Sequence, residues 1–455
     1  MLNDTIAAIA TPLGEGGLAV IRISGEGSVA IAERCFRPGK RDATPLSKVP
    51  THTVHYGHLH REGVNIDEVL VTVLHAPRTF TREDVVEVSC HGGLLPAKLV
   101  LDALLAAGAR LAEPGEFTRR AFLNGRIDLA QAEAVADVIH ARTELALTAA
   151  TEQLAGKLSA RIHRLRDDLM RALAHVEAHI DFPDEDIAPD TRSQLLARLD
   201  EGGRFIDELL RTANEGQLLR RGVRAAIVGR PNAGKSSLLN QLLGRDRAIV
   251  SPIPGTTRDT IEETANIRGL PVVFIDTAGL REAGDLLEQE GIRRSRESLS
   301  QAELILHVVD RSAPLSDFDR SLMHELSDRK TIWVANKADL PSQLQSPPGS
   351  SHWIEVSCSE GTGVESLKDE IKELLWSGEI RAEMLQVMIN SRHQDALRRA
   401  QLAASQAAQA LREELTLELV AMELRIAANA VGEVVGKTTT EDLLDSIFSQ
   451  FCLGK

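Results

Sequence analysis

The most constraining feature of this chain is a set of four short motifs in a fixed order, three of them directly behind apolar segments. The motifs are Gly229-Arg230-Pro231-Asn232-Ala233-Gly234-Lys235-Ser236, Thr256-Thr257-Arg258-Asp259, Asp276-Thr277-Ala278-Gly279 and Asn336-Lys337-Ala338-Asp339. Ala225–Val228, Val272–Ile275 and Ile332–Ala335 precede the first, third and fourth motifs, which predicts three strands that each lead into a motif. A lone phosphate-loop match is weak, but four ordered motifs together predict a P-loop domain for a guanine nucleotide.

The first motif has the spacing G-x-x-x-x-G-K-S between a predicted strand and a helix that begins near Lys235. Backbone N–H groups of such a loop point inward, and the helix N-terminus favours an anion. We therefore expect Lys235 to bridge the β- and γ-phosphates and the Ser236 hydroxyl to ligate Mg²⁺.

The other three motifs complete a nucleotide site. Asp276 is expected in the magnesium shell, the Gly279 N–H at the γ-phosphate, and the Thr257 hydroxyl on the metal. The Asp339 carboxylate can accept hydrogen bonds from N1–H and the 2-amino group of guanine. Adenine has an acceptor at N1 and lacks that amino group, so the sequence predicts GTP rather than ATP as the substrate.

Length and composition set the broader limits. A chain of 455 residues is too long for one core and suggests about three domains. No apolar run approaches the roughly 18 residues of a membrane span, the first residues make a poor secretory signal, and the four cysteines lie far apart. We expect a cytoplasmic protein without membrane association. The formal net charge of -14 argues against non-specific polyanion binding by the whole molecule.

The pattern along the chain predicts an α/β plus all-α protein in four segments. Residues 1–118 are expected to form an α+β domain, 119–216 and 381–455 to be helical, and 217–380 to form a Ras-like P-loop GTPase domain. The helical flanks are consistent with one bundle that carries the GTPase domain as an insertion, although two separate helical domains fit equally well. A final helix, Glu441–Phe451, is predicted with Thr439 as its cap.

The hydrolytic group is not obvious from the motifs. Ras-type GTPases orient the attacking water with a glutamine, whereas the corresponding position here is Leu280. Glu282 is the nearest carboxylate and is the candidate for this role. The missing positive charge could come from Arg281, Arg258, a partner's arginine or a bound cation. Asn232 could bind a monovalent cation with the loop of residues 251–256, or it could simply cap the phosphate loop.

Further sequences along the whole chain resemble those of one family, the tRNA uridine-modification GTPases of the MnmE (TrmE) type. The matching segments are Asp4-Thr5-Ile6-Ala7-Ala8, Arg22-Ile23-Ser24-Gly25, His91-Gly92-Gly93, Pro114-Gly115-Glu116-Phe117-Thr118, Arg119-Arg120-Ala121-Phe122-Leu123-Asn124, Leu129-Ala130-Gln131-Ala132-Glu133, Asp181-Phe182-Pro183 and Phe451-Cys452-Leu453-Gly454-Lys455. The GTPase motifs are widely shared, but the last of these segments is specific to the family.

The resemblance implies an N-terminal domain that binds a tetrahydrofolate and dimerises, a helical domain, and an inserted GTPase domain. The implied reaction places a carboxymethylaminomethyl or aminomethyl group on C5 of the wobble uridine of certain tRNAs. It uses a one-carbon unit from 5,10-methylenetetrahydrofolate or a 5-formyltetrahydrofolate analogue. The implied assembly is a homodimer that joins the flavoprotein MnmG (GidA) in a heterotetramer, with FAD and NADH on that partner.

The resemblance also assigns residues by position. Arg22, Glu87, Arg126 and Lys455 would contact the folate, with Arg126 standing where relatives can carry Lys. The Mg²⁺ ligands would be Ser236 and Thr257, and Glu282 would orient the water. Asn232, Ser251, Ile253 and Thr256 would hold a K⁺ ion that acts between two GTPase domains. The remaining nucleotide contacts would come from Ala233, Gly234, Lys235, Ser237, Pro252, Pro254, Gly255, Thr257, Asp276, Thr277, Ala278, Gly279, Asn336, Lys337, Ala338, Asp339, Ser357, Cys358 and Ser359.

Two alternatives stay open. Cys452 could be a nucleophile toward the uridine ring, or it could simply belong to a tail that packs near the folate, which is the interpretation we favour. The whole chain could instead be a ribosome-associated GTPase that acts as a binding switch. Binding of a reduced folate would separate the two functions.

Overall fold

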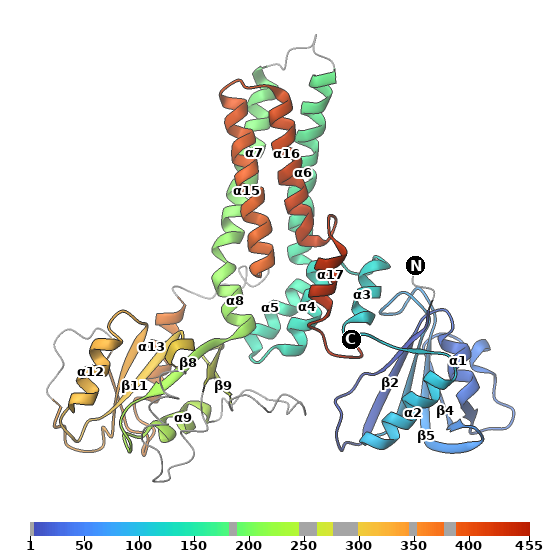
Figure 1. The fold of residues 1–455 in the computed structure, drawn as a ribbon, viewed down its shortest axis with the longest axis horizontal. Coiled ribbons are helices and arrows are strands. Elements are labelled where there is room, and N and C mark those ends of the chain that lie inside the picture. Colours follow the sequence, from blue (N-terminus) through green and yellow to red (C-terminus); the bar gives the residue numbers. More distant parts are fainter. Residues whose placement is uncertain (1–3, 182–188, 245–261, 276–298, 345–352, 377–387) are drawn as a thin grey trace. The chain divides into compact units, whose positions relative to one another are not determined.

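The computed structural model describes residues 4–181, 189–244, 262–275, 299–344, 353–376 and 388–455 (Figure 1). The chain divides into two compact units. Unit 1 comprises Met1–Ala136, Ser159–Leu196 and Leu402–Lys455, and unit 2 comprises Asp137–Leu158 and Ala197–Gln401. Each unit is therefore built from segments that are far apart in the sequence.

Unit 1 contains a seven-stranded sheet in the order β3-β4-β5-β6-β2-β1-β7. Its strands are β1 (Ile6–Ile9), β2 (Leu18–Ser24), β3 (Phe36–Pro38), β4 (Thr53–Arg61), β5 (Val64–Leu74), β6 (Val85–His91) and β7 (Arg110–Leu111). All neighbours pair antiparallel except β1 and β7, which are parallel. Ala19, Ile21 and Ile23 alternate along β2 toward a core that also takes side chains from α1 (Ser28–Cys35) and α2 (Leu94–Ala106). Arg22 therefore lies on the opposite face of the sheet, paired in register with Glu87.

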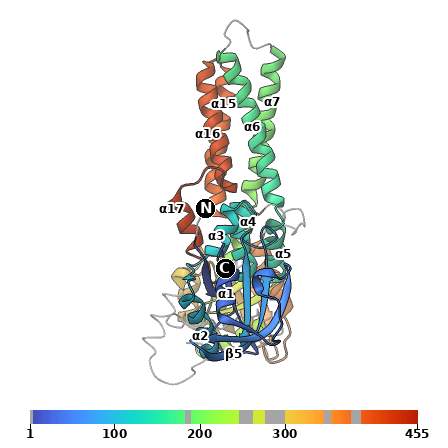
Figure 2. The same ribbon diagram turned by 90° about the vertical axis from the view of Figure 1, so that its right-hand side faces the viewer.

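The helices of unit 1 come from both sides of the nucleotide-binding motifs (Figure 2). Besides α1 and α2 they are α3 (Glu116–Leu123), α16 (Leu417–Val435) and α17 (Glu441–Phe448), with most of α4 (Leu129–His140) and α6 (Lys157–Asp181), the start of α7 (Pro189–Arg211) and the end of α15 (Ser391–Arg412). Arg192 donates to the Leu411 carbonyl at 2.8 Å and forms an ion pair with Glu414 at 2.9 Å. The two helical flanks thus belong to one folded unit, which confirms the insertion rather than two separate helical domains.

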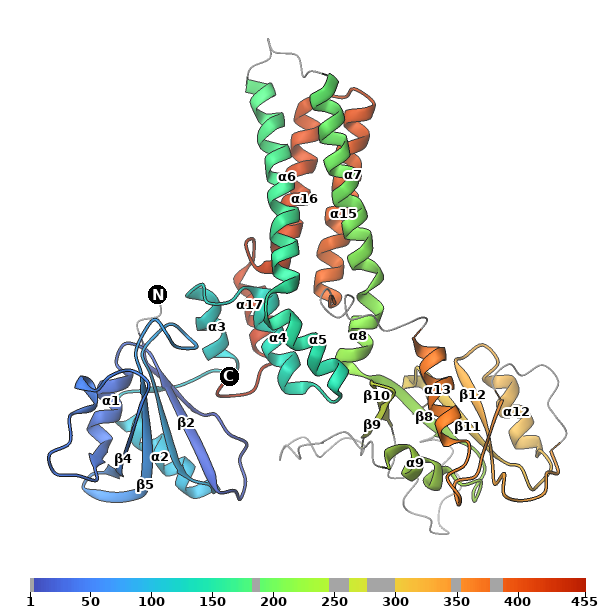
Figure 3. The same ribbon diagram turned by 180° about the vertical axis from the view of Figure 1, so that it is seen from behind.

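Unit 2 is built on a six-stranded sheet in the order β13-β12-β11-β8-β10-β9 (Figure 3). Its strands are β8 (Val223–Val228), β9 (Glu263–Ile267), β10 (Leu270–Phe274), β11 (Leu304–Asp310), β12 (Thr331–Asn336) and β13 (Trp353–Val356), all parallel except the pair β9–β10. The central strands are buried along nearly their whole length, as expected for a parallel sheet covered on both faces.

Helices pack against this sheet and complete unit 2. They are α5 (Glu144–Leu154), α8 (Ala213–Arg221), α9 (Lys235–Leu243), α12 (Asp317–Glu325) and α13 (Val364–Leu375). Ala146 and Ala149 of α5 and Leu219 of α8 share one core with β8, β10 and α9. Unit 2 therefore extends beyond the predicted residues 217–380, although the domain boundaries at residues 118, 216 and 380 stay predictions.

The last helix differs from its predicted form at both ends. Thr440, not Thr439, is the N-cap of α17, and its side chain accepts from the Leu443 N–H at 3.4 Å. The helix ends at Phe448, three residues before the predicted Phe451. Three consecutive threonines all offer a capping hydroxyl, so the sequence alone does not select among them. Among the residues the structure describes, no helix is long and apolar enough to cross a membrane.

Candidate functional site

The phosphate loop joins the end of β8 to the start of α9, as its spacing predicts. Gly229 has φ 144°, and a Cβ atom there would lie 2.1 Å from the Val308 carbonyl oxygen. Gly234 has φ 99°, and its Cβ would lie 1.9 Å from Nδ2 of Asn336. Both positions require glycine because a side chain would collide with the backbone of β11 at Gly229 and with Asn336, at the end of β12, at Gly234. Asn232 also has a positive φ, 62°, which asparagine tolerates better than most residues.

Lys235 occupies the position from which its ammonium can reach phosphate oxygens. Its Nζ donates to the carbonyl oxygens of Gly229 at 2.9 Å and Arg230 at 2.8 Å, so the side chain arches back over the loop. Burial lowers the pKa of Lys235. A bound anion would reverse this effect because it favours the charged ammonium. Ser236 and Ser237 lie in the first turn of α9, beside this lysine.

Asn336 connects the phosphate loop to the base-binding side of the site. This residue is 3 % exposed, and its Nδ2 donates to the Ala233 carbonyl at 2.9 Å. Its Oδ1 accepts from the Cys358 N–H at 3.2 Å. One amide therefore ties Ala233, 103 residues before it, to Cys358, 22 residues after it, and it fixes the distance between the phosphate and base ends.

Asp339 is prepared to accept hydrogen bonds. The Ser357 hydroxyl donates to its Oδ1 at 2.6 Å and lies 2.9 Å from the Ser359 hydroxyl. The hydrogen bond from Ser357 is the main reason that the pKa of Asp339 is lowered. The carboxylate is thus ionised at neutral pH, with acceptor capacity left for two donors on the edge of a guanine ring.

Two residues that the sequence reasoning missed hold this base-binding loop. Lys337, at φ 65°, is paired through its Nζ with Asp310 at 2.6 Å. Arg311 donates to the carbonyl oxygens of Ala338 and Leu340, each at 3.2 Å. Asp310 is the last residue of β11 and Arg311 follows it. Their place at the end of a buried strand is the one feature of the sequence that could have identified them.

Part of the expected site lies outside the described residues. These positions are Ser251, Pro252, Ile253, Pro254, Gly255, Thr256, Thr257, Asp276, Thr277, Ala278, Gly279 and Glu282. The structure therefore brings together Asn232, Ala233, Gly234, Lys235, Asn336, Asp339 and Ser357–Ser359, and it is silent on the second metal hydroxyl, the γ-phosphate sensor and the water-orienting carboxylate.

A second group of predicted residues meets in unit 1, beneath the C-terminal segment. The Arg22 guanidinium lies 2.9 Å from the Glu87 carboxylate and donates to the Gly454 carbonyl at 3.2 Å. It also lies over the Phe117 ring, 5.8 Å from its centroid. Gly454, at φ 86°, approaches β1 so closely that a Cβ would lie 2.5 Å from the Ile9 carbonyl. The distant ends of the chain thus form one surface.

The other two predicted folate residues lie at the edges of this group. The Lys455 carbonyl accepts from the Phe117 N–H at 3.2 Å, which places Lys455 at the start of α3. Arg126 donates to the Thr79 carbonyl at 2.8 Å and lies over the Phe80 ring. Cys452 is exposed, and its carbonyl accepts from the Gly115 N–H at 3.4 Å. No contact joins Arg126 directly to Arg22 among the interactions described here.

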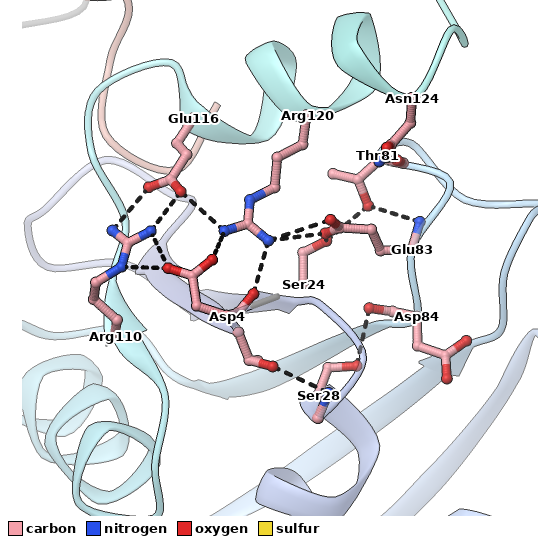
Figure 4. Close-up of polar contacts among 12 residues, drawn as sticks. Asp4, Ser24, Ser28, Thr81, Glu83, Asp84, Arg110, Glu116, Arg120 and Asn124 are labelled. Carbon is pink, nitrogen blue, oxygen red and sulfur yellow. Dashed lines mark hydrogen bonds and ion pairs between the residues drawn. The ribbon is translucent and has the colours of Figure 1, made fainter. Parts of the chain in front are cut away.

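A buried polar network fixes α3 beside the sheet (Figure 4). Arg120, only 1 % exposed, contacts the carboxylates of Asp4 at 2.7 Å, Glu116 at 3.0 Å and Glu83 at 3.2 Å. Arg110 adds a second cation, 2.6 Å from Glu116. Burial opposes ionisation of Glu116, but the hydrogen bonds from Arg110, the Glu113 N–H and Arg120 outweigh it and lower the pKa of Glu116. The network holds the helix whose first turn meets the C-terminal segment.

The residues present suit the groups expected here. Arg22 and Glu87 are part-buried, with 21 % and 29 % of their side chains exposed, and offer a donor and an acceptor side by side. That is the pairing a pterin edge, which carries ring N–H, amino and carbonyl groups, can use. In the phosphate loop, the positive φ of Asn232 lies in a turn whose backbone N–H groups suit the phosphate anion, so the side-chain amide oxygen of Asn232 is the group that would hold a cation.

Comparisons with known proteins agree with this arrangement. The model of the "MnmE helical domain" matches residues 129–452, and that of the "GTP-binding protein TrmE N-terminus" matches residues 5–126. The helical-domain match encloses the nucleotide-binding motifs, as an insertion requires.

Full-length relatives give the same result. The tRNA modification GTPase MnmE of Geobacter sulfurreducens is 47% identical over 459 residues, covering 100% of both chains, and that of Geobacillus kaustophilus is 46% identical over 462 residues, covering 99% of each. A crystal structure of Aquifex aeolicus Era with GDP and AlF4⁻ is 27% identical over 40% of this chain and 66% of that one, with a TM-score of 0.27. The chain is a GTP-hydrolysing enzyme, and it belongs to the MnmE (TrmE) family of tRNA modification GTPases.

Proposed function

We propose that this GTPase acts with a flavoprotein of the MnmG (GidA) type to modify C5 of wobble uridine 34 in tRNA. The product would carry a carboxymethylaminomethyl or aminomethyl group. A tetrahydrofolate would supply the one-carbon unit in unit 1, while FAD and NADH would belong to the partner. The working assembly would be a cytoplasmic heterotetramer built on a homodimer of this chain. Full-length similarity to the tRNA modification GTPases supports this proposal.

The observation that carries the proposal is the pairing of two sites in one chain. Asp339, Asn336 and Lys235 are set for a guanine nucleotide. In a separate polar surface, Arg22 pairs with Glu87 and donates to the Gly454 carbonyl. A GTPase that served only as a ribosome-binding switch would have no use for the second surface. The folate-type surface therefore favours an enzyme that acts on RNA.

Within the GTPase site, each residue has a defined task. Asp339 and Asn336 recognise and place the base, Lys235 neutralises the β- and γ-phosphates, and the Ser236 and Thr257 hydroxyls would hold Mg²⁺. Glu282 would orient the attacking water. Asn232, with Ser251, Ile253 and Thr256, would hold K⁺, and two GTPase domains would meet across it. The cation would supply the positive charge that an arginine supplies in other GTPases.

In unit 1, Glu87 would accept hydrogen bonds from the amino and ring N–H groups of a pterin. Arg22, held by Glu87 and by the Gly454 carbonyl, would donate to the ring carbonyl. Arg126 and Lys455 would neutralise the carboxylates of the folate tail. When bound, the folate supplies carbon at the oxidation level of formaldehyde or formate to the partner's chemistry.

The potassium proposal is tested by GTP turnover in KCl and NaCl at equal ionic strength. We expect strong stimulation by K⁺ in the wild type and its loss in Asn232→Ala, with GDP affinity largely retained. Asn240→Ala, the same change at an exposed position of α9 with no assigned nucleotide or cation contact, is the control and should keep the stimulation by K⁺. Equal rates in both salts would refute the role of potassium.

The folate proposal is tested separately by equilibrium binding of 5-formyltetrahydrofolate to the purified protein. Glu87→Gln should weaken binding by about tenfold or more, because a charged acceptor is replaced by a neutral amide. Glu68→Gln, an exposed glutamate on the adjacent strand, should leave binding unchanged. Absence of folate binding in the wild type would favour the ribosome-associated alternative.

A further inference from the structure

A fully buried carboxylate lies against the phosphate loop, outside all four nucleotide motifs. Asp319 is on α12, is 0 % exposed, and places Oδ2 3.0 Å from Nε of Arg230. Arg230 is the second residue of the phosphate loop, and its side chain is about a third exposed. An ionised carboxylate removed from water is costly unless it is paired, so its partners are informative.

The partners of Asp319 show that it carries its charge. The Ser316 N–H and hydroxyl donate to Oδ2 at 3.0 Å and 2.7 Å, and Nε2 of the buried His307 lies 3.7 Å from Oδ1. Burial raises the pKa of Asp319, but His307, the two Ser316 donors and the Arg230 charge outweigh it, giving a pKa of about 2. The carboxylate is therefore an anion at neutral pH, and it faces the guanidinium group of Arg230.

Arg230 transmits this contact to the reacting end of the site. Its carbonyl oxygen accepts from Nζ of Lys235 at 2.8 Å and from the Ala233 N–H at 3.3 Å. The side chain of Arg230 is thus held by Asp319 while its main chain holds the lysine that faces the phosphates. A shift of the Arg230 backbone would move the ammonium group directly.

A simple helix cap does not account for this arrangement. Ser316 and Asp319 form a capping box at the start of α12, which by itself calls for an acceptor but not for burial. Asp317, in the same turn, is fully exposed and pairs with Arg320 at the surface. Only the third position of the turn points its carboxylate toward the phosphate loop.

We propose that Asp319 is a positioning residue of the GTP site, which through Arg230 fixes the phosphate loop and the ammonium of Lys235. Asp319 touches neither substrate nor reacting atoms. It acts on the affinity for the β- and γ-phosphates and leaves recognition of the guanine base to Asp339 and Asn336.

The test uses the full-length protein with Asp319→Asn, Arg230→Gln and the double variant. We expect each single variant to raise the dissociation constant for GDP about tenfold, since a hydrogen bond between charged groups is weakened or lost. The double variant should bind GDP no more weakly than the single variant with the lower GDP affinity, because both changes break the same contact between Asp319 and Arg230. Binding stoichiometry and the ratio of GDP to IDP affinity should stay at wild-type values, because IDP lacks only the 2-amino group of the base.

Two controls separate positioning from stability. Asp317→Asn makes the same chemical change in the same helical turn and should alter neither GDP affinity nor melting temperature. Ser316→Ala removes a capping hydroxyl and should lower the melting temperature while changing GDP affinity less than twofold. Arg230→Lys, which keeps the charge, should retain part of the wild-type affinity.

Three results would overturn the proposal. The first is a folded Asp319→Asn protein with wild-type GDP affinity. The second is a double variant whose effects add, which would show independent roles. The third is a changed GDP to IDP ratio, which would place the effect at the base. If Asp319→Asn does not fold, the comparison of Arg230→Gln with Arg230→Lys decides the same question.

Discussion

Single side chains set the selectivity of the nucleotide site. The Ser357 hydroxyl donates to Asp339 and lowers its pKa, whereas the Asn336 amide bridges Ala233 and Cys358. We therefore propose that selectivity for guanine depends on the Asp339 carboxylate, which would accept from two donors of the base. Asp310 and Arg311 hold the loop that carries this carboxylate, through Lys337 and through the Ala338 and Leu340 carbonyls.

Asp339→Asn should exchange the base preference. The amide loses one acceptor and gains a donor, so GDP affinity should fall by about a hundredfold for two weakened hydrogen bonds. XDP, which has a carbonyl at C2 where guanine has an amino group, should bind better to the variant than to the wild type. Competition of both nucleotides against a fluorescent GDP measures this. A variant that keeps its preference for GDP would contradict the assigned role of Asp339.

Cys452→Ser should leave tRNA modification largely intact. The thiol is exposed, and the contact that orders this residue is made by its backbone carbonyl with the Gly115 N–H. A serine preserves that contact. Modification by the complete system is the measurement, with folate binding verified in the same preparation. Near-total loss of modification despite bound folate would show that Cys452 is a nucleophile.

At the scale of helices and strands, the sequence predicts most elements because their patterns are local. The strands before the first, third and fourth motifs and the helix that begins near Lys235 all appear within a few residues of their expected positions. The features that the sequence did not predict depend on tertiary contacts. The association of α5 with the nucleotide-binding core rests on two alanines, which any helix face could carry. The contacts of Asp319 with Arg230 and of Arg22 with Gly454 join positions that no local pattern relates.

The network around α3 should make unit 1 sensitive to acid. The pKa values of Asp4 and Glu116 are lowered from their ordinary values of 3.8 and 4.5, so their ionised forms stabilise the fold above that range. This stabilisation is lost as the pH falls below the ordinary pKa values of these carboxyl groups and through their lowered ones. Arg120→Met should destabilise unit 1 by about 3–5 kcal/mol at pH 7, because it removes the buried cation shared by three carboxylates and leaves Glu83 without that partner, while Asp4 and Glu116 keep Arg110.

The difference between Arg120→Met and wild type should shrink toward pH 4, since protonation of these carboxylates in the variant relieves the loss of the cation. Hydrogen exchange of β1 and β2 at both pH values measures it. Arg119→Met, which removes a surface ion pair with Asp445, is the control and should cost less than about 1 kcal/mol. A difference that does not depend on pH would mean that Arg120 acts through packing alone.

At the scale of the whole chain, the division into two units does not follow the order of the sequence. Residues 137–158 belong with the nucleotide-binding core, whereas residues 129–136 just before them belong to unit 1. A ligand that binds unit 2 should therefore stabilise residues 137–158 as well as residues 197–401, which lie on the two sides of residues 159–196 in the sequence.

GDP should protect α5 from hydrogen exchange together with α9. At a hundred times the dissociation constant, mass action adds about 2.7 kcal/mol to the stability of the unit that binds. The residues of α4 up to Ala136 belong to the other unit and serve as the internal control. Exchange followed by mass spectrometry with and without GDP measures this. Protection of α9 without α5 would show that the two helices do not unfold as one unit.

The contact of Arg192 with Leu411 closes a span of 219 residues, and this has a consequence for biosynthesis. A ribosome delivers α6 and the start of α7 long before α15 and α16 exist. The helical part of unit 1 cannot close until residues 402–455 have emerged, whereas all of unit 2 is available once Gln401 has left the exit tunnel. Unit 2 can thus complete its fold on the nascent chain before the helical part of unit 1 can. In that interval, the apolar side of α6 is the surface that a chaperone would have to shield.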